Sequence, residues 1–183
     1  MTRLLAAVLA AFATLAAWGA VAQAAPKDSI VIGMTLEPPM LDPTAGAAAA
    51  ISEVTYRNIF EGLTALDSSM RVQPRRSNSG SVSADGLVYD FKLQPGVTFS
   101  DGARFDCSVV KFSYDRARGP DSVNAHKDKF EPIASIACPD PLSAVVTLKR
   151  PTGGFLVDMG TTDAVMVSPG SAAGNKTNPI GTG

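Results

Sequence analysis

The chain has 183 residues, of which 45% are hydrophobic and 18% charged, and its formal net charge is −1. The 16 basic residues form no patch or run that would offset the 17 acidic ones, so the sequence predicts no nucleic-acid partner. Only 7% of the residues are aromatic, whereas glycine and proline account for 16 and 13 residues. This composition favours a loop-rich α/β chain over a helical bundle.

The N-terminus has the pattern of a secretory signal peptide. Arg3 precedes an apolar run over residues 4–17, and Ala22–Ala24 supplies the small residues of a cleavage site before Ala25. A transmembrane anchor is the alternative, but it needs about 20 consecutive apolar residues. No cysteine stands at the cleavage site, which disfavours a lipid anchor. We therefore expect residues 1–24 to be removed and the mature protein to be exported in soluble form.

The first half of the mature chain alternates short strands with a helix. Ser29–Met34 is a brief apolar run followed by a proline-rich loop, and it predicts a buried strand. Residues 47–62 predict a helix, although their apolar side chains form no single face. Leu87–Leu93 alternates apolar and polar residues and predicts a strand with one buried side. A turn at residues 94–96 predicts that Val97–Phe99 continues as its hairpin partner.

The second half begins with an amphipathic helix, for which Asp106 is the predicted N-cap. The predicted buried face of this helix recurs at helical spacing and comprises Val110, Ser113, Tyr114 and Ala117. Two strands joined by a turn, a short helix and a last strand are expected to follow. These elements span Ile133–Ala137, Ala144–Lys149, Phe155–Met159 and Ala164–Val167.

The two cysteines, Cys107 and Cys138, form an even pair in a chain that we expect to be exported. An oxidising compartment favours a structural disulfide over two free thiols, which remain the alternative. Such a bridge would contribute about 3–4 kcal/mol by restricting the unfolded chain. No histidine or further cysteine stands near either sulfur, so no metal site is expected.

Catalysis finds little support in the sequence. The single histidine, His126, stands in a polar segment, and no nucleophile motif such as G-x-S-x-G accompanies it. The glycines of Gly181–Gly183 lack the lysine of a phosphate-binding loop. We therefore expect neither enzymatic activity nor a cofactor.

Six short blocks follow one another in an order and spacing that resemble one known family. The blocks are Leu36–Pro43, Asn58–Leu63, Ser83–Phe91, Val97–Phe105, Val109–Tyr114 and Pro179–Gly183. They resemble, respectively, the E-P-x-x-L-D-P, I-[FY]-E-[GP]-L, S-x-D-G-x-x-[YW]-x-F, V-x-F-[HS]-[DN]-G-x-x-F, D-V-x-F-[ST] and P-[IV]-G-T-G elements of the family-5 extracellular solute-binding proteins. Members of this family serve peptide and nickel ABC importers in bacteria.

The resemblance implies the α/β fold of a type II periplasmic binding protein, in which two lobes close on a ligand by hinge motion. By this resemblance residues 25–44 start the first lobe, residues 45–175 form an inserted mixed αβ subdomain, and residues 176–183 return to the first lobe. The second lobe would follow residue 183, so we expect the chain to be an incomplete copy.

The function implied by the resemblance is that of the substrate-binding component of an ABC importer. Such a protein captures peptides or a similar small solute in the periplasm and delivers it to permease subunits in the inner membrane, and we expect it to be a monomer. The alternative from another class is a small exported interaction or structural domain that binds no solute.

The resemblance also implies a ligand-binding surface drawn from three segments. Glu37 could bind a peptide ammonium through a charge-assisted hydrogen bond; a solvated loop carboxylate is the equally weighted alternative. Lys129 is also interpretable as surface charge, and Ala47 would form part of a smooth wall. The full set of expected ligand-binding residues is Leu36, Glu37, Gly46, Ala47, Lys129, Thr161, Thr162 and Asp163.

One stretch departs from the family pattern. Between Pro74 and Val82 the chain carries arginine, serine, asparagine and glycine, where relatives carry L-A-x-x-W. Losing three apolar side chains from a core removes buried area worth several kcal/mol at about 25 cal/mol per Å². If this stretch is genuine sequence rather than a paired frameshift, the subdomain is expected to be less stable than its relatives.

Overall fold

The structure is a computed structural model that describes residues 29–183. The chain divides into two compact units, residues 1–33 and 34–183. The predicted signal peptide lies outside the described residues. Of the first unit, residues 29–33 form no strand, so the predicted strand Ser29–Met34 is wrong. Ile30, Val31 and Ile32 are 82%, 96% and 73% exposed, since no described strand pairs with them.

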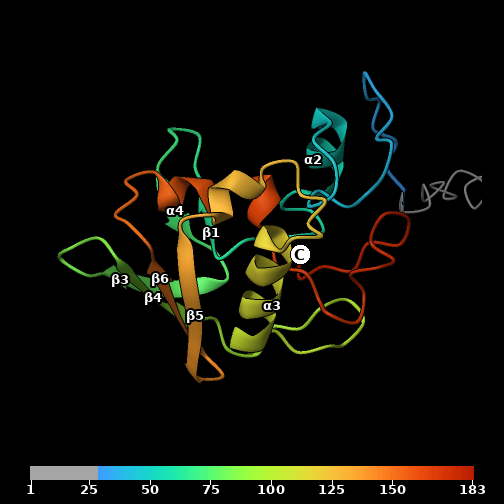
Figure 1. Cartoon of the computed structure of the whole chain (residues 1–183). Coiled ribbons are helices and arrows are strands. Elements are labelled where there is room, and N and C mark those ends of the chain that lie inside the picture. The colour runs from blue at the N-terminus through green and yellow to red at the C-terminus, as the bar shows by residue number, and fades with distance from the viewer. Residues whose placement is uncertain (1–28) are drawn as a thin grey trace, which may run out of the picture. The chain divides into compact units, whose positions relative to one another are not determined.

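A four-stranded antiparallel sheet is the centre of the second unit (Figure 1), with the strand order β3-β4-β6-β5. The strands are β3 (Ser77–Val82), β4 (Val88–Leu93), β5 (Ile133–Asp140) and β6 (Ser143–Leu148). The alternation expected of β4 is confirmed, because Tyr89, Phe91 and Leu93 are buried. The two strands expected at β5 and β6 also form, with β5 extending through Asp140 before it turns.

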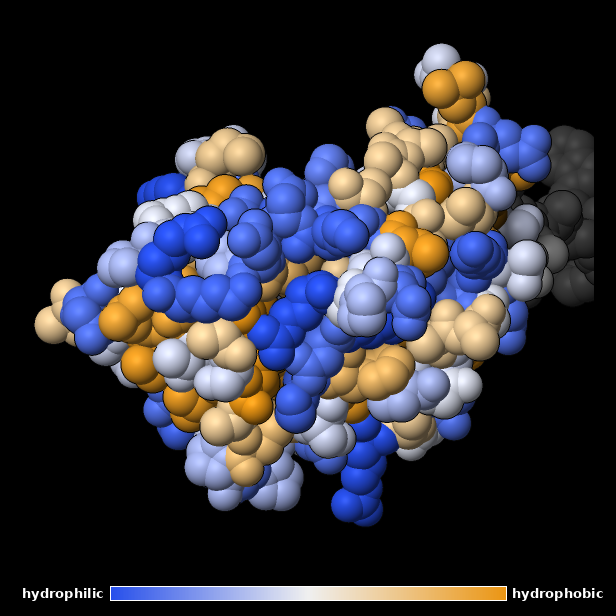
Figure 2. Space-filling model, in the orientation of Figure 1, coloured by the Kyte–Doolittle hydropathy of each residue, from blue (hydrophilic) through white to orange (hydrophobic). Residues whose placement is uncertain are grey.

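Helix α3 (Cys107–Arg118) packs beside β5 and β6 (Figure 1). It begins as predicted, because the Asp106 carboxylate accepts a hydrogen bond from the amide of Ser108 at 2.8 Å. Its four predicted core positions are all buried, and Val110 and Tyr114 are fully so. Figure 2 shows hydrophobic residues reaching the surface over the sheet, at the left of the view.

Shorter elements complete the unit. A two-stranded ribbon pairs β1 with β2, and a single turn of helix, α4, forms where one was expected. No helix among the described residues is long and apolar enough to cross a membrane. The bounds are α2 (Ala49–Thr55), β1 (Thr64–Leu66), β2 (Val72–Pro74), α4 (Phe155–Asp158) and the 3-10 turns η2 (Lys127–Phe130) and η3 (Thr162–Ala164).

Helix α2 ends seven residues earlier than the predicted helix over residues 47–62. Arg57 takes a left-handed backbone conformation with φ of 66°, which a continuing helix does not allow. The side chain of Asn58 donates to the carbonyl of Val54 at 3.0 Å and so satisfies one of the last helical acceptors. The remaining residues form the turn that leads into β1.

Two further strand predictions fail, although the residues concerned are buried. Val97–Phe99 does not pair with β4; it closes on residues 103–105 instead, since Gly96, at φ of 74°, redirects the chain. In Ala164–Val167 the amide of Met166 donates to the carbonyl of Glu61 at 2.8 Å and that of Val167 to the Ser113 hydroxyl at 2.9 Å. Each segment forms only an isolated bridge among the described residues, Thr98 with Arg104 and Val165 with Gly62, so neither becomes a strand despite its burial.

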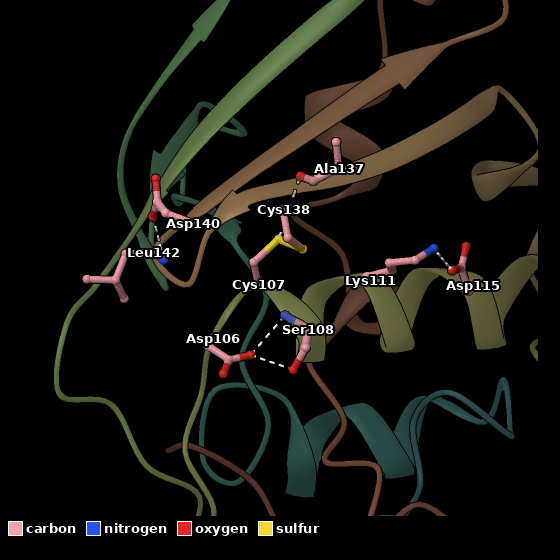
Figure 3. The surroundings of a disulfide bond; sticks show 9 residues. All are labelled: Asp106, Cys107, Ser108, Lys111, Asp115, Ala137, Cys138, Asp140 and Leu142. Carbon is pink, nitrogen blue, oxygen red and sulfur yellow. Dashed lines mark hydrogen bonds and ion pairs between the residues drawn. A yellow bond between two sulfur atoms is a disulfide. The ribbon is translucent and has the colours of Figure 1, made fainter.

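Cys107 and Cys138 are joined by a disulfide that ties the first residue of α3 to β5 (Figure 3). The two Cα atoms are 5.7 Å apart, and the bridge spans 31 positions of sequence. The bridge links the helix directly to the sheet on which it packs. It therefore reduces the conformational freedom of the unfolded chain between two elements of the core.

Replacing both cysteines by serine should lower the free energy of unfolding by about 3–4 kcal/mol, the chain-entropy value for a loop of this length. Urea unfolding of the double variant and of the oxidised wild type measures the change, and reduced wild type should unfold like the variant. A double variant as stable as the oxidised wild type would contradict this account.

Tyr114 carries a second testable feature of the core. Its ring packs against Phe130, its side chain is fully buried, and its hydroxyl has no hydrogen-bond partner in the described part of the chain. Burial raises the pKa of Tyr114 above its usual range. Stability is therefore fully present below the unfolded pKa of about 10 and is lost as the pH rises above it.

Tyr114→Phe should raise the free energy of unfolding by about 1 kcal/mol at neutral pH, because it removes an unsatisfied buried hydroxyl. The variant should also lose less stability than wild type between about pH 9 and about pH 11. Urea unfolding at both pH values measures the two effects. Equal alkaline losses in both proteins would exclude Tyr114 as their source.

Candidate functional site

Three of the expected ligand-binding residues lie together at the start of η3. The Lys129 ammonium group contacts the Asp163 carboxylate at 2.6 Å and the Thr161 hydroxyl at 3.3 Å. Thr161 in turn donates to the carbonyl of Asp158 at 2.6 Å. Asp163 is buried, and the side chain of Lys129 retains 22% exposure. The two charges neutralise each other, so this cluster presents polar groups without a free charge.

Helix α2 is fastened to the same segment by two hydroxyl groups. Ser52 donates to the hydroxyl of Thr162 at 3.2 Å, and Tyr56 donates to the carbonyl of Gly160 at 2.5 Å. Burial raises the pKa of Tyr56 despite the opposing effect of Arg57, so Tyr56 remains a donor. The fourth residue of the expected set, Thr162, thus contacts α2 rather than Lys129.

The other expected residues lie on the loop that precedes α2. Leu36 is 69% exposed, and Glu37 and Ala47 are also exposed. Gly46 packs closely against Ile51 and Met40, which leaves no room for a side chain there. No hydrogen bond or ion pair among residues 29–183 connects Glu37 to another residue, so its carboxylate is available to a solute.

An anchor that sequence reasoning missed holds this loop on α3. The buried carboxylate of Asp42 accepts from the amide and the hydroxyl of Thr44, at 2.9 and 2.6 Å. Arg116 contacts the other carboxylate oxygen at 3.3 Å and donates to the Thr44 hydroxyl at 2.6 Å. The available signal in the sequence was Asp42 itself, which stands between a leucine and a proline in a loop. If such an acidic residue is buried, it needs a cationic partner.

A second missed cluster surrounds the buried carboxylate of Glu61. Arg75 donates to it at 2.5 Å through its Nε atom, and Arg76 forms a further ion pair with it. Burial lowers the pKa of the Arg76 guanidinium. Thr182 donates to Glu61 at 3.3 Å and accepts from Arg76 at 3.1 Å. The cluster therefore joins three segments that are far apart in the sequence.

The last residues of the chain pack tightly on the turn before β1. The amide of Gly183 donates to the carbonyl of Ile59 at 3.0 Å, and that of Ser100 donates to the carbonyl of Gly181 at 2.9 Å. A side-chain carbon at Gly181 would collide with the Ile59 carbonyl, so only glycine allows this approach. Two of the motif blocks, around Ile59 and around Gly181, thus touch each other.

Comparison with known proteins identifies the family of the unit in which these clusters lie. Residues 71–183 match the family model described as bacterial extracellular solute-binding proteins, family 5 Middle. The matched segment holds Arg76, Lys129, Asp163 and Thr182, and covers more than half of the chain. The chain belongs to this family.

Individual family-5 proteins resemble the chain over most of its length. The glutathione-binding protein GsiB of Pectobacterium atrosepticum is 34% identical over 164 residues, which are 87% of this chain and 31% of that protein. The protein of the same name from Salmonella paratyphi A is 34% identical over 98% of this chain and 34% of its own length. The chain therefore spans about a third of the length of the curated relatives it matches.

Solved structures show the same fold. The chain resembles NikZ from Campylobacter jejuni, solved in complex with Ni(L-His), with a TM-score of 0.74 and 30% identity over 87% of this chain and 32% of NikZ. The oligopeptide-binding protein AppA from Bacillus subtilis, solved with a nonapeptide, gives a TM-score of 0.71 at 23% identity over 80% of this chain and 31% of AppA. The mixed α/β unit is thus that of part of a periplasmic binding protein.

Within this family-5 unit, the Glu61 cluster should contribute strongly to stability. Glu61→Gln leaves two guanidinium groups without a counter-ion beside a buried site, so we expect a loss of about 3 kcal/mol in the free energy of unfolding. The matched control is Arg71→Gln, which removes an exposed ion pair with Asp67 and should cost less than about 1 kcal/mol. Chemical denaturation of both variants measures the contrast, and equal losses would contradict it.

Proposed function

We propose that this chain contributes to the substrate-binding component of an ABC importer that captures peptides or a similar small solute. The proposal is carried by the family-5 match over residues 71–183, and the glutathione, Ni(L-His) and nonapeptide in the names of its relatives support a small or peptide ligand. Residues 25–44 and 176–183 would belong to the first lobe, and residues 45–175 to the subdomain inserted into it.

The proposed ligand-binding wall consists of the loop before α2 and the segment around η3. Glu37 supplies a carboxylate that no described residue occupies, whereas Lys129 and Asp163 neutralise each other. A wall with one free negative charge favours the ammonium group of a peptide or amino acid derivative. Ala47 would let the ligand backbone approach closely, and the hydroxyl of Thr161 lies beside the ion pair.

Location and partners follow from the same proposal. The component would work in the periplasm after removal of residues 1–24, as a monomer that delivers its solute to permease subunits in the inner membrane. Binding proteins of this kind enclose the ligand between two lobes, and closure creates the surface that the permease recognises. One wall alone buries too little of a ligand for measurable affinity.

A hybrid protein tests the proposal. This chain would replace the matching third of the Pectobacterium atrosepticum glutathione-binding protein, and calorimetry would measure glutathione binding. We expect the hybrid to bind glutathione and the chain alone to show no measurable binding. Glu37→Gln should weaken binding by the hybrid about tenfold, the loss of one charge-assisted hydrogen bond worth about 1.4 kcal/mol.

The control variant is Glu53→Gln, because Glu53 is an exposed carboxylate on α2 that the proposed wall does not include. It should leave the affinity of the hybrid unchanged. A hybrid that folds, as judged by circular dichroism, but binds no glutathione would contradict the proposal. Micromolar binding by the chain alone would contradict the two-walled arrangement.

A further inference from the structure

The central sheet has two edges, and the β5 edge is covered. The Arg118 guanidinium of α3 donates to the carbonyls of Ile133 at 2.6 Å and Ala134 at 3.4 Å. The pairing of β5 with β6 also shifts register twice, and Pro139 has no N–H to offer. Covering side chains, bulges and proline are the means by which proteins keep an edge strand from pairing with another chain. The β5 edge is therefore closed to a further strand.

The other edge, formed by β3, is uncovered along Ser79–Val82, beyond its one register shift (Figure 1). These residues are exposed, and β3 contains neither a charged residue nor a proline. Ser83 donates to the Val88 carbonyl at 2.9 Å, and bonded and non-bonded pairs alternate along an antiparallel ladder. Gly80 and Val82 therefore turn their N–H and C=O groups outward, where no hydrogen bond within residues 29–183 involves them.

Ser29–Met34 has the opposite deficiency, that of a strand-forming sequence without a sheet. Ile30, Val31 and Ile32 are 82%, 96% and 73% exposed, and no described strand pairs with them. Their β-branched side chains favour an extended, paired conformation. Pairing would also remove apolar surface from water. The chain thus carries both an unused sheet edge and an unpaired apolar segment as long as β3.

We propose that Ser29–Met34 of one copy pairs with the β3 edge of a second copy, and that two copies exchange this segment reciprocally. In this mode of association, backbone hydrogen bonds between an extended segment and a free edge supply the affinity. A second copy is the partner because it carries both halves of the contact, and neither half brings a charge that pairing would bury. Reciprocal exchange leaves neither β3 edge free, so the assembly stops at a closed dimer.

The faces of the two strands match in an antiparallel register that places Ile32 opposite Gly80 and Ile30 opposite Val82. On their other side Gly80 and Val82 pair with buried aromatic residues of β4, so these positions present side chains to the core face of the sheet. Ile30 and Ile32 would continue that apolar face by one strand and cover Val82, which is 47% exposed.

The exchange is separate from the proposed function. Neither strand includes Glu37 or the cluster around Lys129. In the importer component proposed above, residues 25–44 would belong to the first lobe, so the exchange concerns the chain of 183 residues by itself. Its failure would leave the proposed function untouched.

Sedimentation velocity of the purified chain, combined with amide hydrogen exchange, tests the exchange. A contact of this size should give a dimer dissociation constant of about 10 μM, so the chain should be mostly dimeric at about 100 μM and monomeric at about 1 μM. Hydrogen exchange at the amides of Gly80 and Val82 should slow about fivefold at the higher concentration, because only about a fifth of the chains would then be monomeric.

Two variants at Ile32 separate strand pairing from general hydrophobic contact. Ile32→Pro keeps an apolar side chain but removes the N–H that would bond the β3 edge, so it should weaken dimerisation at least about tenfold. The matched control, Ile32→Thr, keeps the N–H and a β-branched side chain, and should dimerise more tightly than the proline variant. Both substitutions fall on an exposed residue, so neither should alter the fold, which circular dichroism checks.

A chain that stays monomeric at about 100 μM would overturn the proposal, as would equal dimerisation of wild type and Ile32→Pro. Protection of Gly80 and Val82 that does not depend on concentration would also overturn it, because the segment would then pair within its own copy. Concentration-dependent protection along β5 in place of β3 would show that copies associate through the wrong edge.

Discussion

The buried carboxylate of Glu61 is the constraint on which the rest of the unit depends. Removing a carboxylate from water costs several kcal/mol unless cationic groups and hydrogen bonds replace the solvent. Arg75, Arg76 and Thr182 supply that replacement. They can do so only if the connection from β2 to β3 and the end of the chain both reach the turn before β1. One buried charge thereby fixes the relative positions of three distant segments.

The same turn positions the proposed ligand-binding wall. Helix α2 enters the turn at Thr55, and Ser52 of the helix and Tyr56 just after it contact the segment around η3. On the other side, the Asp42–Arg116 pair fastens the loop before α2 to α3. The wall is therefore held at one end by the hydroxyl groups of Ser52 and Tyr56 and at the other by the Asp42–Arg116 ion pair, while the side chains of Leu36, Glu37 and Ala47 stay exposed. A rigidly held surface whose exposed side chains make few bonds within the protein suits the binding of a solute.

Sequence patterns predicted the elements whose burial follows a simple period. Helix α3 and strands β4 and β6 carry buried apolar residues at regular spacing, and Asp106 caps α3 as its position indicates. Strand β3 could not be predicted in this way, because Ser77–Val82 has no apolar alternation and forms by pairing with β4. Likewise, the sequence pattern suggested that Arg75 and Arg76 replace core residues, since their partner Glu61 stands fourteen positions before Arg75 in sequence. Of the expected site residues, the structure joins Lys129, Thr161 and Asp163 in one cluster and leaves Glu37 apart.

That separation bears on how a family-5 unit of this kind could select a solute. Relatives whose names cite glutathione, Ni(L-His) and a nonapeptide share this region of the fold. The shared fold therefore cannot by itself distinguish such different solutes. Discrimination has to come from side chains that the frame leaves unpaired, because only these can exchange water for a ligand without first breaking a structural bond. On the wall proposed here Glu37 meets that condition, whereas Lys129 and Asp163 would have to give up their ion pair.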